Sequence, residues 1–176
     1  LPTTIELELA ELIVKHIPCA EMVRFAKNGS DVTSAAIRLA RAYTGKEIIA
    51  VSGYHGWHDW YIGTTTRDLG VPKKISKFTK SFEFNNINSF KKLLNESKNN
   101  IAGVIIEPES GIIANKNFLK QLREITKQKK IILIFDEIVT GFRVNFSGAQ
   151  AKYDIKPDLA CFGKSLANGM PLSVIT

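Results

Sequence analysis

Two repeating patterns of apolar positions divide the chain into expected strands and expected helices. Short apolar runs bounded by glycine, proline or polar residues predict strands over residues 22–26, 47–51, 101–106, 131–135, 159–162 and 172–175. A weaker run predicts a further strand near residues 81–84. Because strands separated by helical segments are typical of layered α/β domains, the pattern favours a mostly parallel sheet.

Apolar residues at helical spacing predict four helices. The first follows Thr3 and Glu6, which have the spacing of a capping box, and it ends before Pro18. The second presents an apolar face from Val32 to Tyr43 and stops at a glycine. The other two are expected over residues 87–98 and 116–129, as right-handed crossovers between parallel strands.

Length and composition agree with one soluble domain. The chain has 176 residues, of which 44% are hydrophobic, enough to bury a substantial core. Its apolar runs are far shorter than the roughly 20 residues that span a bilayer, and its start does not resemble a secretory signal. We therefore expect a cytoplasmic protein without membrane contact. The chain stops directly after an expected strand, so residues 1–176 are expected to be a fragment of a longer protein.

Charge and cysteine content change this picture little. The net charge of +7 would suit nucleic-acid binding, but the lysines are scattered over expected helices and loops, so a solvated surface is the preferred interpretation. Cys19 and Cys161 lie far apart, and two buried thiols explain them better than a disulfide framework or a zinc site does.

Polar residues follow several expected strands, where open α/β sheets bind their ligands. Gly29 and Ser30 follow the first strand and open a helix, whose first N–H groups attract anions. Tyr54 and His55 belong to the aromatic loop SGYHGWHDWY after the second strand, where a ring can stack on a planar cofactor. The alternatives are an ordinary helix cap, ordinary loop packing, or a metal held by the histidines of that loop.

Two charged residues follow later strands. Asp136 comes directly after the apolar run IILIF, so it should face a cation or several hydrogen-bond donors. Lys164 belongs to the triplet GKS, which imitates the end of a nucleotide-binding P-loop, but Asp158 stands where that loop needs its first glycine. Lys164 is therefore expected to be a single amine at a strand end, on a strand next to that of Asp136.

Together these groups meet the needs of pyridoxal 5'-phosphate. The aldehyde of this cofactor needs a lysine amine, its pyridine nitrogen needs a carboxylate that keeps it protonated, and its phosphate needs an anion site. Lys164, Asp136 and the helix start at Gly29 and Ser30 are candidates for these three tasks.

Five segments carry a resemblance to a known family. EMVRFAKNGSDVTSAAIRLARAYTGK, GYHGWHD, IIEPESG, LIFDEIVTGFR and PDLACFGKSLANGMPL are similar, in order and approximate spacing, to segments of the class-III, fold-type I aminotransferases, which use pyridoxal phosphate, and among them to the glutamate-1-semialdehyde aminomutases. The resemblance implies a three-layer α/β/α large domain around a mostly parallel seven-stranded sheet with one antiparallel strand. The small C-terminal domain of the family would be absent from these residues.

The resemblance also implies a role for each matching residue. Lys164 would be the Schiff-base lysine, and Asp136 would pair with the pyridine nitrogen. Tyr54 would stack on one face of the cofactor and Ile138 would pack on the other. The remaining cofactor-binding residues, two at the phosphate and two along the walls, would be Gly29, Ser30, His55 and Glu107.

The expected reaction is amino-group transfer from a small-molecule amino donor to a carbonyl acceptor, or its intramolecular version. Lys164, once displaced by the substrate amine, would move a proton between the substrate carbon and the cofactor. The turn NGS and the loop PESG after Glu107 depart from the usual family pattern, so the resemblance leaves the substrate open. The full-length protein is expected to be a homodimer. The alternatives are a truncated or degenerate domain that binds the cofactor without activity, and a nucleotide-binding protein.

Overall fold

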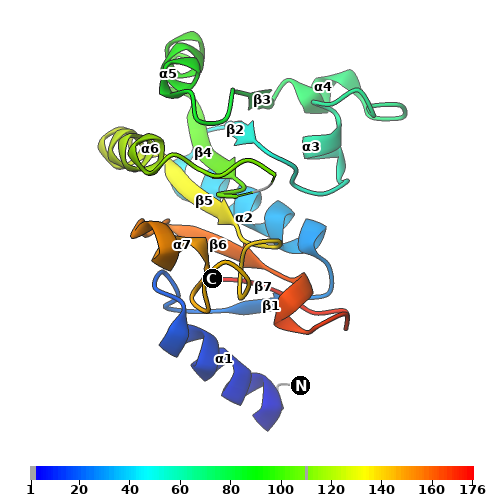
Figure 1. Cartoon of the computed structure of the whole chain (residues 1–176). Helices are drawn as coiled ribbons and strands as arrows, with labels where there is room; N and C mark the ends of the chain where they lie inside the picture. The colour runs from blue at the N-terminus through cyan, green and yellow to red at the C-terminus, as the bar shows by residue number, and fades with distance from the viewer. Residues whose placement is uncertain (1–2, 110) are drawn as a thin grey trace.

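One seven-stranded sheet forms the centre of the computed structural model, which describes residues 3–109 and 111–176 (Figure 1). In chain order the strands are β1 (Arg24–Ala26), β2 (Ile48–Ser52), β3 (Thr79–Ser81), β4 (Ile101–Ile106), β5 (Ile132–Asp136), β6 (Leu159–Phe162) and β7 (Ser173–Ile175). Their order across the sheet is β1-β7-β6-β5-β4-β2-β3. Within the described residues β7 runs antiparallel to both of its neighbours and the other six strands run parallel, which confirms the predicted sheet.

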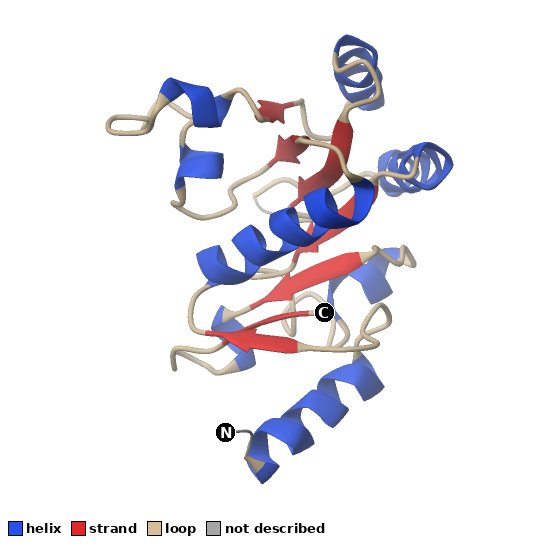
Figure 2. Cartoon of the chain, turned by 180° about the vertical axis from the view of Figure 1, so that it is seen from behind, coloured by secondary structure: helices blue, strands red, loops and turns tan. Residues whose placement is uncertain are grey.

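Helices cover both faces of this sheet. Figures 1 and 2, seen from opposite sides, show α2 (Gly29–Thr44) across one face and α5 (Ile87–Glu96), α6 (Lys116–Lys129) and α7 (Gly148–Tyr153) on the other. Helix α1 (Thr4–His16) projects beyond the edge formed by β1, and the segment that connects β2 to β3 contains the short helices α3 (Asp59–Ile62) and α4 (Lys73–Ser76). The three-layer α/β/α arrangement is therefore confirmed.

Strand β4 shows why the sheet needs both helical layers. All six of its residues are buried, and successive side chains point to opposite faces. Val104 belongs to a core cluster with Phe90 of α5 and Leu122 of α6, whereas Ile105 packs in a second cluster with Ala40 of α2. Because each large apolar side chain buried in this way contributes about 1.5–3 kcal/mol, the continuous apolar run of β4 stabilises both interfaces.

The prediction of a weaker strand near residues 81–84 is wrong about the position of this strand. Strand β3 covers Thr79–Ser81, and its ladder with β2 ends where the Phe82 N–H donates to the carbonyl of Val51 at 3.1 Å. The Glu83 N–H donates instead to the Ser89 hydroxyl at the start of α5. The apolar signal came from Phe82 and a second phenylalanine, Phe84, whose rings pack on α5 and α6 rather than extending the sheet.

The helix ends follow their capping signals. The Thr3 N–H donates to the Glu6 carboxylate at 3.0 Å and the Glu6 N–H donates to the Thr3 hydroxyl at 3.2 Å, so the predicted capping box is confirmed. Helix α2 ends at a left-handed Gly45, as expected, but begins at Gly29, ahead of the apolar face that predicted it. No helix within the described residues has both the length and the apolar character that crossing a bilayer requires.

Candidate functional site

A cavity of about 520 Å³ lies at the edge of the sheet where the carboxyl ends of β1, β2, β4, β5 and β6 meet. The segments that follow these strands, together with residues 169–172 before β7, form its walls. All of the residues predicted for the site line this one cavity: Gly29, Ser30, Tyr54, His55, Glu107, Asp136, Ile138 and Lys164. The topology thus brings together residues that are more than 130 positions apart in the sequence.

Asp136 ends β5, and its carboxylate, 3% exposed, has two hydrogen-bond donors. Oδ2 lies 2.8 Å from Nδ1 of His55, and Oδ1 accepts the Ile138 N–H at 3.2 Å. The expectation that Asp136 faces several donors is therefore confirmed. Carboxylate oxygens accept hydrogen bonds, so the contact with Asp136 suits the His55 tautomer that has its proton on Nδ1. The other ring nitrogen, Nε2, is buried without a hydrogen-bond partner among the described residues.

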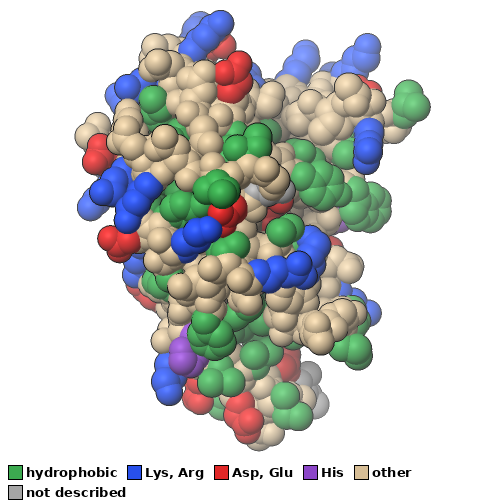
Figure 3. Space-filling model, viewed as in Figure 1, with side chains coloured by type: hydrophobic (Ala, Val, Ile, Leu, Met, Phe, Trp, Pro, Cys, Tyr) green, Lys and Arg blue, Asp and Glu red, His purple; other side chains and the backbone are tan. Residues whose placement is uncertain are grey.

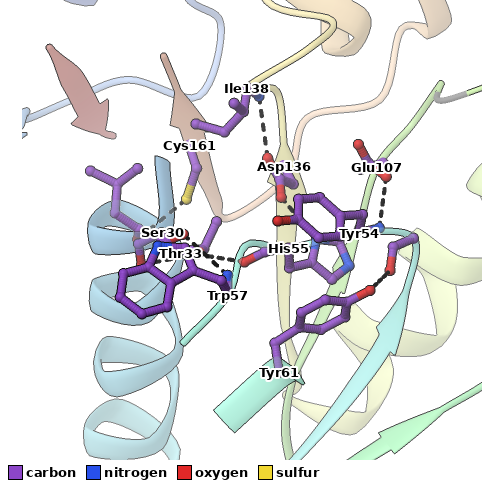
Figure 4. Close-up of polar contacts among 12 residues, drawn as sticks. Ser30, Thr33, Tyr54, His55, Trp57, Tyr61, Glu107, Asp136, Ile138 and Cys161 are labelled. Atoms are coloured by element: carbon purple, nitrogen blue, oxygen red, sulfur yellow. Dashed lines mark hydrogen bonds and ion pairs between the residues drawn. The ribbon is translucent and has the colours of Figure 1, made fainter. Parts of the chain in front are cut away.

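Aromatic neighbours hold the His55 ring in place. It stacks on Trp60 at 6.5 Å between ring centroids, and it meets the edge of Tyr61 at 5.3 Å. The carbonyl of His55 accepts the hydroxyl of Thr33 at 3.1 Å, which ties the loop to α2 (Figure 4). These contacts leave the ring little freedom, so the hydrogen bond to Asp136 is preorganised.

Tyr54 and Glu107 meet through the backbone. The Tyr54 N–H donates to the Glu107 carboxylate at 2.7 Å, and Gly53 (φ 111°) allows this approach because a Cβ there would lie 2.9 Å from a Glu107 oxygen. The Tyr54 ring is 54% exposed and contacts Tyr61 edge-on. Tyr61 donates to the Gly53 carbonyl at 2.8 Å, and burial, followed by the nearby Glu107 charge, raises the pKa of Tyr61. The Tyr54 ring is thus anchored on one side and open on the other.

The turn that starts α2 is fixed from several directions. The carbonyl of Asn28 accepts the Ser173 hydroxyl at 2.8 Å, and the Asn28 N–H donates to Asp31 at 2.8 Å. The Ser30 hydroxyl accepts the Trp57 N–H at 3.3 Å, so the aromatic loop closes over the helix start (Figure 4). An N-terminus of a 16-residue helix held in this way is a suitable anion site.

Ile138 fills a gap left by two glycines. A Cβ built on Gly29 would lie 3.0 Å from the Ile138 side chain, and one on Gly163 would lie 3.1 Å from it. The half-buried Ile138 also lines the cavity. It therefore forms an apolar wall between the start of α2 and the segment that carries Lys164.

Lys164 stands just beyond β6, separated from Phe162 by one glycine, as the sequence predicts. Its φ of 43° is left-handed, a conformation that costs an L-residue of this kind roughly 1–3 kcal/mol and is often found at functional sites. The next residue, Ser165, accepts a hydrogen bond from Nε of Arg143. Lys164 itself is exposed and forms no ion pair with another described residue.

Sequence reasoning missed the role of Glu137. This fully buried carboxylate accepts the Thr140 hydroxyl at 2.5 Å, the Ala149 N–H at 2.7 Å and the Gln150 N–H at 3.1 Å, and burial raises its pKa. It connects the end of β5 to the start of α7 and so shapes the loop that carries Ile138. An acidic residue next to Asp136 in an apolar run was the available signal, but its partners were not evident from spacing.

The structure also shows the surroundings of the two cysteines, of the loop histidines and of Asp158. Both cysteines are buried, as predicted. His55 and His58 have different partners, because His58 Nδ1 pairs with the Ser34 hydroxyl at 2.7 Å, and the described residues contain no group of three or more potential metal ligands. Asp158 precedes β6 and pairs with Arg123 at 2.7 Å. Ser110, in the loop after Glu107, lies outside the described residues.

A second cavity, of about 590 Å³, lies at the opposite edge of the sheet, where β6 begins. Its walls include Arg123 and Asp158, which neutralise one another, and Asp158 also accepts the Leu133 N–H at 2.8 Å. Size alone would favour this cavity, but the residues that could hold a cofactor line the smaller one. We therefore take the cavity at the carboxyl edge as the candidate functional site.

Comparisons with known sequences identify the family of this chain. The family model for class-III aminotransferases matches residues 2–176. The chain is 42% identical to the glutamate-1-semialdehyde 2,1-aminomutase of Natranaerobius thermophilus, over 97% of its own length and 43% of that protein. It is 43% identical to the aminomutase of Methanocaldococcus jannaschii, over 99% of its own length and 44% of that protein. The chain thus spans less than half the length of these relatives.

Solved structures show the same fold. An omega-transaminase from Sphaerobacter thermophilus superposes with a TM-score of 0.90 at 32% identity, over 99% of this chain and 44% of that one. The FumI protein of Sphingopyxis sp. MTA144, in its PLP internal aldimine form, gives 0.92 at 31% identity, over 99% of this chain and 43% of that one. By its sequence and its fold, the chain belongs to the class-III aminotransferase family.

Proposed function

We propose that this chain is the large, pyridoxal-phosphate-binding domain of an enzyme that transfers amino groups. One observation carries the proposal: Asp136 and Lys164 follow the neighbouring parallel strands β5 and β6 and line the same cavity as the start of α2. Open α/β sheets bind ligands at this edge. The FumI structure with its bound cofactor and the aminomutase relatives support the same assignment.

The residues of the cavity fit the cofactor. Asp136 offers a carboxylate, Lys164 an amine, and α2 an anion site, while the orphaned Nε2 of His55 points to a polar ligand in this part of the site. The volume of about 520 Å³ lies within the usual range for small-molecule sites. When bound, pyridoxal phosphate supplies an aldehyde that takes up amines and a protonated ring that withdraws electrons from the reacting carbon.

Each residue then has a defined task. Asp136, oriented by the Ile138 N–H and by His55, holds the proton on the ring nitrogen. Tyr54 and Ile138 would hold the ring, and the N–H groups of Gly29 and Ser30 would bind the phosphate. Lys164 would hold the cofactor through its amine, and its Nζ atom would move a proton at the substrate carbon. Glu107 holds the Tyr54 backbone in place.

The proposed substrates are a small-molecule amino donor and a carbonyl acceptor. The aminomutase relatives support transfer of the amino group within one molecule, whereas the transaminases of similar structure support transfer between two molecules. We propose a homodimer in the cytoplasm for the full-length protein. The second candidate is a domain that binds the cofactor without catalysis.

Labelling with pyridoxal phosphate tests the proposal. The protein is incubated with the cofactor, its visible absorbance is recorded, the complex is reduced with borohydride and the modified peptide is mapped. We expect the label on Lys164 and its loss in Lys164→Ala, whereas Lys91→Ala on α5 serves as the matched control and should label normally. A label confined to other lysines and unaffected by Lys164→Ala would reject the cofactor assignment. Labelling without conversion of the cofactor by any amino donor would favour the binding domain.

A further inference from the structure

A second lysine lines the candidate site and has no task in the proposed function. Lys27 lies between β1 and the start of α2, and it lines the same cavity as Lys164 and Asp136. Among the described residues it has no ion-pair partner. The chain therefore places a lysine without an ion pair at one end of the cavity, where the nearest acidic residue in the sequence, Asp31, bonds to the Asn28 N–H.

Charges are separated along this cavity. The acidic residues Asp136 and Glu107 follow β5 and β4, in the middle of the sheet, whereas Lys27 follows β1 at its edge, with β7 and β6 between them. The positive end of the α2 dipole lies on the side of Lys27. The cavity thus complements a ligand that has an anionic group at the α2 end and a proton-bearing group near Asp136.

Two further observations describe the polar groups of this cavity, one at the turn after Lys27 and one beside Asp136. The turn after Lys27 is held by the Ser173 hydroxyl on the Asn28 carbonyl and by Asp31 on the Asn28 N–H, so the N–H groups of the next residues are fixed in direction. Independently, the buried Nε2 of His55, which lines the same cavity, has no hydrogen-bond partner among the described residues. Buried polar atoms of this kind are usually satisfied by a ligand or water.

We propose that Lys27 is a counter-ion for the phosphate of the bound cofactor. The inference rests on the proposed function, because it assumes pyridoxal phosphate in this cavity. The N–H groups at the start of α2 supply directed hydrogen bonds, and the ammonium of Lys27 supplies the full positive charge that they lack. Since Lys27 is exposed, salt screens its contribution.

Binding measurements with two ligands test this role. Dissociation constants are determined for pyridoxal phosphate and for pyridoxal, which lacks the phosphate, with the protein at full natural length and freed of cofactor. Lys27→Gln should weaken pyridoxal phosphate binding roughly tenfold at low salt and less at high salt, and leave pyridoxal binding within about twofold. Lys27→Arg should restore most of the affinity. Lys91→Gln on α5 removes the same charge far from the cavity and should change neither constant.

The outcomes separate this inference from the proposed function. If the unmodified protein does not bind pyridoxal phosphate, both fail. If it binds and Lys27→Gln binds equally well, or if the variant loses both ligands to the same extent, only the role of Lys27 is overturned. A loss confined to an anionic amino substrate would place the anion on the substrate and would also overturn it. Unchanged thermal unfolding of Lys27→Gln would show that the variant is folded.

Discussion

Two neighbouring carboxylates at the end of β5 are both buried, yet they serve different parts of the molecule. Asp136 bonds to His55 at the cavity, whereas Glu137 bonds to Thr140 and to the first N–H groups of α7. Adjacent residues in an extended segment point to opposite sides, so one carboxylate lines the cavity and the other bonds within the fold. The two should therefore respond differently to mutation.

Asp136→Asn should preserve cofactor binding and slow proton transfer. The amide can still accept the Ile138 N–H, but it carries no charge to hold a proton on the ring nitrogen. We expect the rate of amine-dependent conversion of the cofactor to fall by about 10²–10⁴-fold, measured by absorbance in single-turnover experiments. Near-normal turnover would mean that Asp136 has another function.

Glu137→Gln should remove a pH dependence from the stability. Burial raises the pKa of Glu137 above its ordinary value of 4.5, while bonds from Thr140 and α7 oppose this shift. Since the folded state holds this proton more tightly, the contribution of Glu137 is fully present below pH 4.5 and is lost as the pH rises through the folded-state pKa. The free energy of unfolding of the unmodified protein, minus that of Glu137→Gln, should therefore fall as the pH rises from about 4.5. Urea titrations at several pH values measure this difference in free energy of unfolding. A difference that rises with pH would contradict the prediction.

Among the elements, α2 does most to organise the site, because its first turn contacts both the aromatic loop and Ile138. Long elements such as α2 and α6 were predictable, since several turns of apolar periodicity identify them. Helices α3, α4 and α7 were missed because helices of four to six residues give too little periodicity. Strand β3 was misplaced because two core phenylalanines follow it.

Gly56→Ala should loosen the closure of the aromatic loop on α2. Gly56 has φ 99°, and a Cβ would lie 2.3 Å from the Ser30 hydroxyl oxygen. We expect a loss of roughly 2 kcal/mol or more in the free energy of unfolding. Gly45→Ala is the matched control, because Gly45 also has positive φ (66°) but open space around it, and it should cost about 1 kcal/mol. Equal losses in the two variants would argue against the contact with Ser30.

At the scale of the molecule, much of the site followed from the sequence because the polar residues come after strands, and parallel strands end at one edge. Lys164 and Asp136 could be paired on that reasoning alone. The bond between His55 and Asp136 could not be predicted, since it joins residues 81 positions apart and depends on strand order and side-chain direction. The insertion of Ile138 between Gly29 and Gly163 escaped sequence reasoning for the same reason.

The buried sheet should open last when the protein fluctuates. Strand β4 is buried along its whole length in the described structure, whereas most residues of α1 are exposed. We expect amide hydrogens of β4 and β5 to exchange slowest and those of α1 to exchange much faster, measured by mass spectrometry. Protection of α1 equal to that of β4 would show that the two unfold as one unit, contrary to this expectation.

The antiparallel direction of β7 affects where the chain can vary in length. Because β7 is antiparallel to β6, the chain leaves and re-enters the sheet at the same edge, without the long crossover that a parallel strand would need. The intervening segment, residues 163–172, borders the cavity at both of its ends and is exposed over residues 168–170. A change of length at residues 168–170 would therefore leave the pairing of β6 with β7 in place, while it would alter one wall of the cavity, which Gly169 and Met170 line.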